Sequence, residues 1–467
     1  MRVMSVVLSA AAVSVVHAQA IVPAEVILSE GSSPSWAEGL TVSTVNTAYT
    51  SEDGKVGFLA VLSDSRRVIF FDTGPVFFST PSQTGGEGSI GVASGGRFVY
   101  SPSIDGNDGI WGSSGYIISD GDEAPGYPGL YISFASRPSM FGDGLFAFVG
   151  GLASTPTGST AARVLYRGQI GDPVLTPVYR TGDTIDGRTL RFATPGMSFN
   201  YDFSDNGQHV IHIVDVGGAT GSAAVLYNGS IIAEDGQPLP GDPDEGWENF
   251  SGVGVNNGGD TLIWGDFITA SQTDNFIAVN RVPAVREGDT VDGITIPSGS
   301  TVRAASISNI GTAAYIWSFS TTNRVLFHGN IADLRGTSIK VVRIGDLLDL
   351  DGDGIGDLTV RDLPETTTTT SAMDLGDDGY LYTSITVSDI GQTATRKIIA
   401  KFCPGCSTAC PPCAADFNQD GGVDGSDVEA FYVVWESGEG CGDVNEDGGV
   451  DGGDVETFFA RWEAGGC

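Results

Sequence analysis

The sequence predicts a mostly β protein that ends in a small α-helical unit. Glycine is very abundant, with 67 residues among 467, and charge patterns typical of surface helices are scarce. Residues 21–402 carry a weak internal repeat of turns and short apolar runs. Residues 416–467 contain two near-copies of a loop followed by a helical pattern. We therefore expect an all-β repeat domain followed by a duplicated loop–helix module.

The repeat consists of a glycine-containing turn, an apolar strand and a second apolar strand. Asp-Gly and Asn-Gly turns between β-rich runs are hairpin signals. A unit of about four strands cannot bury both of its faces alone, so such units pack radially into a propeller. The seven turns lie at residues 51–54, 94–96, 142–144, 204–207, 256–259, 308–311 and 376–379. We expect a β-propeller-like domain of about seven blades, with a β-sandwich pair and a β-solenoid as alternatives.

A second repeated sequence pattern lies between several of these units, at residues 180–187, 286–293 and 343–346. Within the sixth unit, residues 309–315 read N-I-G-T-A-A-Y. This run resembles the N-x-x-G-x-x-A-F signature of uncharacterised secreted repeat proteins. The resemblance implies a secreted β-repeat body and brings no particular activity.

The N-terminus has the pattern of a secretory signal peptide over residues 1–20. Arg2 supplies a positive charge, residues 3–16 are apolar, and Ala18-Gln19-Ala20 forms an A-x-A cleavage site. The alternative, a retained membrane anchor, needs about 20 apolar residues, and this stretch is shorter. We expect export, cleavage and no membrane span afterwards, which places the protein outside the cell or on its surface.

The two loops near the C-terminus have the ligand spacing of a calcium site. Oxygen donors stand at positions 1, 3, 5, 9 and 12: Asp416, Asn418, Asp420, Asp424 and Asp427 in the first loop, and Asp443, Asn445, Asp447, Asp451 and Asp454 in the second. The carbonyl groups of Gly422 and Gly449 at position 7 add one ligand each. Calcium prefers six to eight oxygen ligands, so both loops predict a Ca²⁺ site.

Each loop leads into a short amphipathic helix. Apolar residues recur at helical spacing: Val428, Phe431, Tyr432 and Trp435, and again Val455, Phe458, Phe459 and Trp462. Position 12 is Asp rather than the Glu of an EF-hand, and no helix pattern precedes either loop. This combination resembles the type I dockerin module, and the Gly-Cys ends of both repeats resemble its planctomycete-type variant. The resemblance implies a calcium-folded tag that docks to a cohesin-like receptor or to the cell envelope.

A third acidic loop lies inside the repeat domain. Asp349, Asp351, Asp353 and Asp357 occupy positions 1, 3, 5 and 9 of a similar pattern, but position 12 is Val360, which cannot bind a metal. We predict a calcium site here that is incomplete or borrows a ligand. The alternative is an ordinary Asp/Gly surface turn.

All six cysteines lie near the C-terminus, at positions 403, 406, 410, 413, 441 and 467. An even number in an exported chain favours disulfide bonds, although the two Cys-x-x-Cys pairs also have the spacing of a zinc site. Residues 403–415, rich in Cys and Pro, are the expected linker between the domains. Six cysteines allow 15 pairings, and the sequence does not choose among them.

Charge and motifs restrict the function. The formal net charge of −35 disfavours nucleic acid and anionic membranes as partners. The sequence contains no nucleophile elbow and no phosphate-binding loop. We therefore expect a non-catalytic exported binding or surface protein, with carbohydrate as a further expected ligand. The alternative is a polysaccharide-degrading glycoside hydrolase with a wide acidic cleft, whereas a binding platform predicts a filled or narrow channel.

Overall fold

The computed structural model describes most of the chain and divides it into two compact units. The described residues are 19–51, 54–79, 90–104, 107–191, 200–217, 221–268, 273–352, 354–364, 373–404, 413–417, 422–437, 440–442, 444–445 and 449–465. The first unit is Met1–Pro404 and the second is Gly405–Cys467. The expected signal peptide falls, up to residue 18, outside the described residues. None of the described helices has the length and apolar character needed to cross a membrane.

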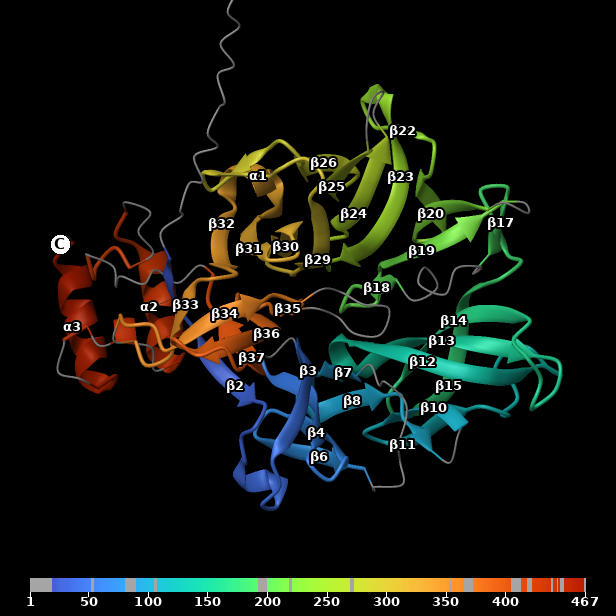
Figure 1. The fold of residues 1–467 in the computed structure, drawn as a ribbon, viewed down its shortest axis with the longest axis horizontal. Coiled ribbons are helices and arrows are strands. Elements are labelled where there is room, and N and C mark those ends of the chain that lie inside the picture. The colour runs from blue at the N-terminus through green and yellow to red at the C-terminus, as the bar shows by residue number, and fades with distance from the viewer. Residues whose placement is uncertain are drawn as a thin grey trace, which may run out of the picture. The chain divides into compact units, whose positions relative to one another are not determined.

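The first unit is a β-propeller arrangement in which six sheets are each built from consecutive strands (Figure 1). The first three sheets contain β3 (Val42–Thr50), β4 (Val56–Leu62), β5 (Arg67–Phe71) and β6 (Gly74–Phe78); β7 (Ile90–Ala93), β8 (Arg97–Tyr100), β9 (Ser103–Ile104), β10 (Asn107–Gly112) and β11 (Gly115–Ser119); and β12 (Tyr131–Phe141), β13 (Leu145–Ala153), β14 (Ala162–Gln169) and β15 (Asp172–Arg180).

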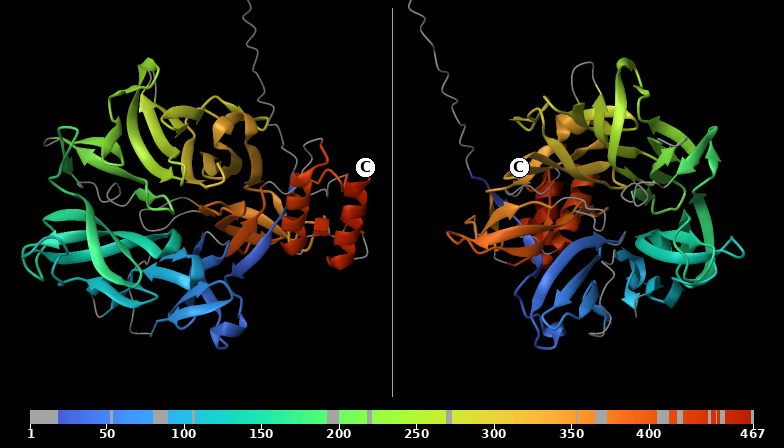
Figure 2. Two further views of the ribbon diagram at one scale, coloured as in Figure 1. Left: turned by 180° about the vertical axis from the view of Figure 1, so that it is seen from behind. Right: turned by 45° about the vertical axis from the view of Figure 1, so that its right-hand side comes forward.

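The next three sheets continue in chain order, from green to orange in Figure 2. They contain β16 (Thr184–Ile185), β17 (Arg188–Arg191), β18 (Tyr201–Phe203), β19 (Val210–Val216), β20 (Ser222–Tyr227) and β21 (Ser230–Glu234); β22 (Pro238–Leu239), β23 (Asp242–Val255), β24 (Thr261–Ile268), β25 (Thr273–Val279) and β26 (Val282–Arg286); and β29 (Thr301–Ile307), β30 (Thr312–Ser320), β31 (Asn323–Asn330) and β32 (Ile339–Arg343). A hairpin of β27 (Thr290–Val291) and β28 (Ile294–Thr295) and the short helix α1 (Leu334–Thr337) lie between these strands in the sequence.

The last sheet joins the two ends of the first unit, and we call it the closing sheet. It combines β1 (Ile21–Pro23) and β2 (Glu25–Ser29) with β33 (Leu347–Asp349), β34 (Leu358–Asp362), β35 (Met373–Leu375), β36 (Leu381–Asp389) and β37 (Arg396–Phe402). Strand β1 pairs in parallel with β33, and β2 pairs antiparallel with β37. The number of blades made from one continuous segment is therefore six, which differs from the expected count of about seven.

The repeat turns found in the sequence have one structural role. Each of them lies between two consecutive strands that pair with each other in one sheet. In the turn at 204–207 the amide of Gly207 donates to the carbonyl of Ser204 at 2.7 Å. Gly207 and Gly311 have φ values of 66° and 80°, a conformation that glycine adopts without steric cost. The turn glycines therefore allow each pair of strands to reverse direction tightly.

Apolar residues from neighbouring sheets form shared cores. Phe141 and Val149 of the third sheet pack with Val214 and Leu226 of the fourth in one buried cluster. The same pattern joins the closing sheet to its neighbours, because Ile399 lies in a cluster with residues of the first sheet. Both faces of the sheets are thus covered, as radial packing requires.

The second unit contains two helices, α2 (Gly425–Ser437) and α3 (Gly452–Glu463). Phe431 of α2 and Phe458 of α3 are fully buried and stack with ring centroids 4.1 Å apart and an interplanar angle of 2°. Phe417 packs edge-on against both rings. Equivalent residues of the two sequence repeats therefore meet at the centre of this unit.

Candidate functional site

Both C-terminal loops end by starting a helix in the same way. Asp427 and Asp454, at position 12, are completely buried. Each accepts a hydrogen bond at 2.8 Å from the backbone amide of the position 9 residue, Asp424 or Asp451. In α3, the Asp451 side chain caps the helix in return by accepting from the amide of Gly453. This reciprocal pair is a capping box, which satisfies amides that a helix start leaves open.

Two tryptophans connect the loops to each other. The indole nitrogen Nε1 of Trp435, on α2, donates to the carbonyl of Asp451 in the second loop at 2.7 Å. Trp462, on α3, donates to the carbonyl of Asp424 in the first loop at 2.8 Å. Each helix thus holds position 9 of the other repeat, so the two loops form one reciprocal structure.

The structure describes only part of each predicted ligand set. Asp416, Gly422, Asp424 and Asp427 of the first loop and Asn445, Gly449, Asp451 and Asp454 of the second are described. Asn418, Asp420, Asp443 and Asp447 lie outside the described residues. The donor set is made of oxygen atoms throughout, which fits a hard cation such as Ca²⁺. Calcium binding at these loops therefore stays a prediction.

The loop at residues 349–357 brings three of its four predicted ligands together. One carboxylate oxygen from each of Asp349, Asp351 and Asp357 lies within 4.8 Å of the others. The buried carboxylate of Asp349 accepts from the amides of Gly352 at 2.8 Å and Gly354 at 2.9 Å. Asp353 lies outside the described residues. The grouping fits a divalent cation, although the same bonds also stabilise a tight acidic turn.

The cysteines are only partly described. Cys403, Cys413 and Cys441 are described and none of these three is a free thiol. Cys406, Cys410 and Cys467 lie outside the described residues, so the pairing of the cysteines stays a prediction.

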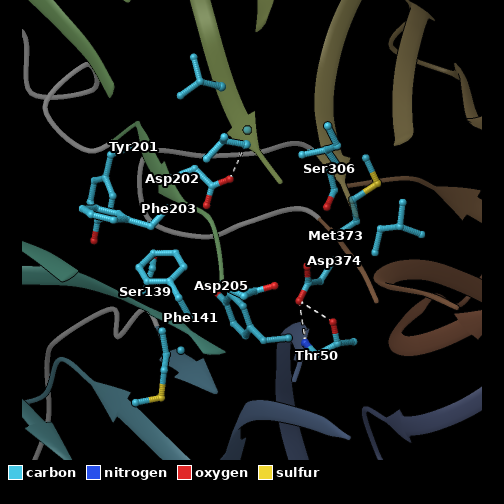
Figure 3. Close-up of a pocket in the computed structure, with 18 of the residues that line it drawn as sticks. Thr50, Ser139, Phe141, Tyr201, Asp202, Phe203, Asp205, Ser306, Met373 and Asp374 are labelled. Carbon is cyan, nitrogen blue, oxygen red and sulfur yellow. Dashed lines mark hydrogen bonds between the residues drawn. The ribbon is translucent and has the colours of Figure 1, made fainter. Parts of the chain in front are cut away.

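The propeller contains a central cavity of about 290 Å³. In each of the seven larger sheets, the strand that precedes the repeat turn contributes to its wall: β3, β7, β12, β18, β23, β29 and β35. The wall contains four carboxylates: Asp202, Asp205, Asp374 and Asp377. Asp205 and Asp374 point toward one another across the cavity (Figure 3). Among the described residues, strands of seven different sheets meet at this cavity.

Two of these carboxylates bind the next sheet, and we call their contacts the inter-blade bonds. Asp202 of β18 accepts from the amide of Val255 in β23 at 2.8 Å. Asp374 of β35 accepts from the amide of Thr50 in β3 at 2.6 Å and from its hydroxyl at 3.0 Å (Figure 3). Each aspartate lies two residues before the repeat turn of its own sheet. Each donor, Val255 or Thr50, is the residue directly before the repeat turn of the neighbouring sheet. The inter-blade bonds are therefore equivalent.

The turns also form a chain of amide contacts at one end of the cavity. The amide of Asn206 donates to the Asn257 side chain at 2.8 Å, and the amide of Asn257 to the Asn309 side chain at 2.7 Å. The amide of Asn309 then donates to Asp377 at 2.8 Å. The Asn309 side chain additionally donates to both Asp205 and Asp377. The wall at this end of the cavity, with Asp205, Asn309 and Asp377, is thus held by hydrogen bonds between neighbouring turns.

Burial changes the acidity of the cavity carboxylates. It raises the pKa of Asp202 to about 8, with a further contribution from the charge of Asp205. It also raises the pKa of Asp374 to about 6, against the effect of the two bonds from Thr50. The pKa of Asp205 is likewise raised by burial. At neutral pH Asp202 therefore carries a proton, whereas Asp374 is mostly ionised.

Sequence reasoning did not find these cavity residues. The turns were visible, but nothing along the chain distinguishes Asp202 or Asp374 from the other acidic residues. Their position two residues before a turn is a signal that could have been used, because that position faces the channel in every repeat. The basic residue of the wall, Arg137, had a weaker signal, the proline that follows it inside an apolar strand pattern.

Comparisons with known proteins give limited information. A family model described as a family of unknown function, DUF7453, matches residues 106–222. No curated protein matches the chain. Among solved structures, puromycin hydrolase is similar with a TM-score of 0.39 and 9% identity, covering 79% of this chain and 53% of that chain.

Two further solved structures are similar at the same low level. Oligopeptidase B from Leishmania major has a TM-score of 0.35 and 14% identity, over 76% of this chain and 47% of that chain. A gluconolactonase from Xanthomonas campestris has a TM-score of 0.26 and 12% identity, over 65% of this chain and 97% of that chain. The chain spans about half the length of the first two enzymes. Similarity at this level supports no statement about activity.

Proposed function

We propose that this chain is an exported, non-catalytic binding protein with a calcium-dependent docking tag. In this proposal the propeller body, residues 21–402, binds a ligand or is displayed on a surface. Residues 416–467 act as the dockerin-like module, which attaches the body to a cohesin-like receptor or to the cell envelope. The linker 403–415 separates the two functions.

The reciprocal contact between the two loops is the observation that carries this proposal. Trp435 and Trp462 each donate to the position 9 carbonyl of the opposite repeat, at 2.7 and 2.8 Å. In an acidic tail that binds no ligand, we would not expect two equivalent loops to form the same hydrogen bond with each other's helix. The duplicated helix starts, with buried Asp427 and Asp454, add to this support.

Calcium would act on the loops by neutralising their clustered carboxylates. Asp416, Asn418, Asp420, Asp424, Asp427 and the carbonyl of Gly422 would hold one ion, and the equivalent residues of the second repeat the other. Without the ion the like charges repel, so we expect the tag to order fully only when calcium is present. The helices α2 and α3, packed together through Phe431 and Phe458, then present their outer faces to a receptor.

Two finer points belong to the same proposal. We count the closing sheet as the seventh blade, because β35 contributes to the cavity wall as the strands before the repeat turns of the other sheets do. We also expect Cys441 and Cys467, which follow equivalent helices, to form a disulfide bond that stabilises the tag by about 3 kcal/mol.

The test is a calcium titration of the full chain by calorimetry. We expect two strong sites, both lost in a chain that carries Asp416→Asn and Asp443→Asn. The matched control is Asp349→Asn, which changes the same charge in the propeller and leaves those two sites intact. Two sites that survive in the double variant, or no binding at about millimolar calcium, would contradict the proposed tag.

A glycoside hydrolase remains the second candidate because of one observation. Asp202 and Asp374 share one cavity and have pKa values raised to about 8 and about 6, as an acid and a base at one site require. Against this, both carboxylates already accept amides of the next sheet. Release of reducing sugar from plant and algal polysaccharides, abolished by Asp374→Asn, would favour the enzyme over the platform.

A further inference from the structure

One basic side chain lines the same cavity as the carboxylates. Arg137 lies in β12, where the pairing with β13 shifts register between Ser136 and Ser139. Such a bulge turns the side chain of the extra residue away from its regular direction, and bulges are frequent beside functional sites. The sequence around Arg137 therefore interrupts the regular pairing of β12 at the cavity wall.

The backbone at Arg137 is held in a costly conformation. Its φ is 55°, in the left-handed region that side chains other than glycine rarely adopt. The next residue is Pro138, which restricts the preceding residue further. The hydroxyl of Tyr201 holds this conformation, because it donates to the carbonyl of Arg137 and, at 3.0 Å, to the carbonyl of Ala147. Strain kept in place by a neighbouring sheet points to a use for the side chain.

The positive and negative groups of the cavity wall belong to different sheets, with Arg137 on β12, Asp202 on β18 and Asp374 on β35. Burial lowers the pKa of Arg137 to about 10, and the other groups that act on it are Tyr201 and Tyr49. Asp202 and Asp374, by contrast, are influenced by Asp205. Arg137 is thus a charged guanidinium beside tyrosines at neutral pH, while the carboxyl groups offer acceptors elsewhere in the same space.

We propose that the central cavity binds a small hydroxylated organic anion, with its carboxylate on Arg137 and its hydroxyl groups toward Asp202 and Asp374. The guanidinium presents a planar set of donors that matches a carboxylate. Hydroxyl groups suit the aspartates in either protonation state, because a hydroxyl both donates and accepts. The cavity of about 290 Å³ is at the lower end of the range for small-molecule sites, and Trp264 and Tyr49 add aromatic surface to its wall.

This inference rests on the binding role proposed for the propeller body and is independent of calcium. Its test measures binding to the full chain by calorimetry, with D-glucuronate as the probe. The neutral counterpart is D-glucose and the cationic counterpart is D-glucosamine. We expect glucuronate to bind at least tenfold more tightly than either, because only it carries the carboxylate. Equal binding of the three sugars, or no binding at about 10 mM glucuronate, overturns the proposal.

Variants then locate the site. Arg137→Gln should weaken glucuronate binding at least tenfold, and Arg137→Lys, which keeps the charge but not the planar donor set, should weaken it less. Arg335→Gln is the matched control, since Arg335 is exposed and pairs with Asp289 outside the cavity. Unchanged glucuronate binding by a folded Arg137→Gln chain overturns the proposal. If neither Arg137 variant folds, the comparison of the three sugars on the unchanged chain decides alone.

A calcium titration of the same samples separates the two proposals. If glucuronate fails to bind while two calcium sites are present, the proposal for the cavity ligand is wrong and the proposal of a docking tag is supported. If glucuronate binds and calcium does not, the cavity assignment stands and the docking tag is wrong.

Discussion

Both units of this chain contain buried aspartates, and the two units use these carboxylates differently. In the propeller, Asp202 and Asp374 accept amides from the next sheet, about 50 residues or several hundred residues away in the sequence. In the second unit, Asp427 and Asp454 accept amides from residues three positions earlier. The first use connects distant segments, and the second one starts a helix.

The two kinds of carboxylate therefore stabilise different parts of the structure. Loss of a local cap affects the helix that it starts, while loss of an inter-blade bond affects two sheets at once. The same type of side chain thus has consequences of different range. The predictions below test this distinction, in order of decreasing expected effect.

The largest effect is expected from Asp374→Ala. The substitution leaves the amide and the hydroxyl of Thr50 without their acceptor, at a cost of roughly 2–4 kcal/mol in the free energy of unfolding. Urea denaturation, followed by a signal of the propeller, should show the midpoint at lower urea. The control Asp374→Asn keeps an acceptor oxygen and should cost less than about 1 kcal/mol. Equal losses in both variants would mean that the inter-blade bond contributes little.

The second effect is a dependence on pH that comes from Asp202. Its folded pKa, raised to about 8, lies above the value of about 3.9 in an unfolded chain, so folding binds the proton more tightly. This stabilising contribution is complete below about pH 4 and is lost as the pH rises through 8. Between pH 6 and 8 we expect a loss on the order of 2 kcal/mol, measured as a falling melting temperature.

Asp202→Asn sharpens the pH prediction because it fixes the neutral form and keeps an acceptor for Val255. Its melting temperature should change less between pH 6 and 8 than that of the unchanged chain. Asp374→Asn should instead flatten the dependence at lower pH, since the pKa of Asp374 is raised only to about 6. An unchanged slope in Asp202→Asn would remove Asp202 as its source.

A third effect, confined to the second unit, is expected from Asp451→Ala. The substitution removes the side chain that accepts from Gly453 at the start of α3, which costs about 1 kcal/mol. Without calcium, where the tag is only partly ordered, its helical signal should be weaker than in the unchanged chain, while the propeller transition stays in place. A shift of the propeller transition would contradict the local role of this carboxylate.

The smallest effect concerns the two tryptophans. Trp435→Phe and Trp462→Phe each remove one indole hydrogen bond to the opposite loop, with an expected loss of about 0.5–1 kcal/mol in the second unit. The two losses should be equal, and in calcium titration each variant should weaken both sites rather than one. Val433→Ala, an exposed change on α2, is the control. Unequal losses would show that the loops are not reciprocal.

Local features of the fold could be predicted from the sequence. The turns at 204–207 and 308–311 contain a glycine that needs positive φ, and the runs beside them have the apolar character of buried strands. The second unit has its helices where the spacing of Phe431 and Phe458 predicts them. These signals are local, because turn geometry and helical periodicity depend on neighbouring residues.

Contacts between distant segments could not be predicted. The bond from Thr50 to Asp374 joins residues 324 positions apart, and no pattern along the chain connects them. The same holds for Arg137, whose conformation is fixed by Tyr201 of another sheet. The number of blades built from one continuous segment differs from the expectation for the same reason, since β1 and β2 complete a sheet whose other strands lie between residues 347 and 402.

The closing sheet has a consequence for how the protein is made. Strand β2 pairs with β37, so residue 26 finds its partner only when residue 400 has been synthesised. Until then the first strands expose unpaired edges, and contacts of such long sequence separation form slowly. A chain that stops before β37 would therefore leave its propeller open, and chaperones or proteases could recognise it by its first strands.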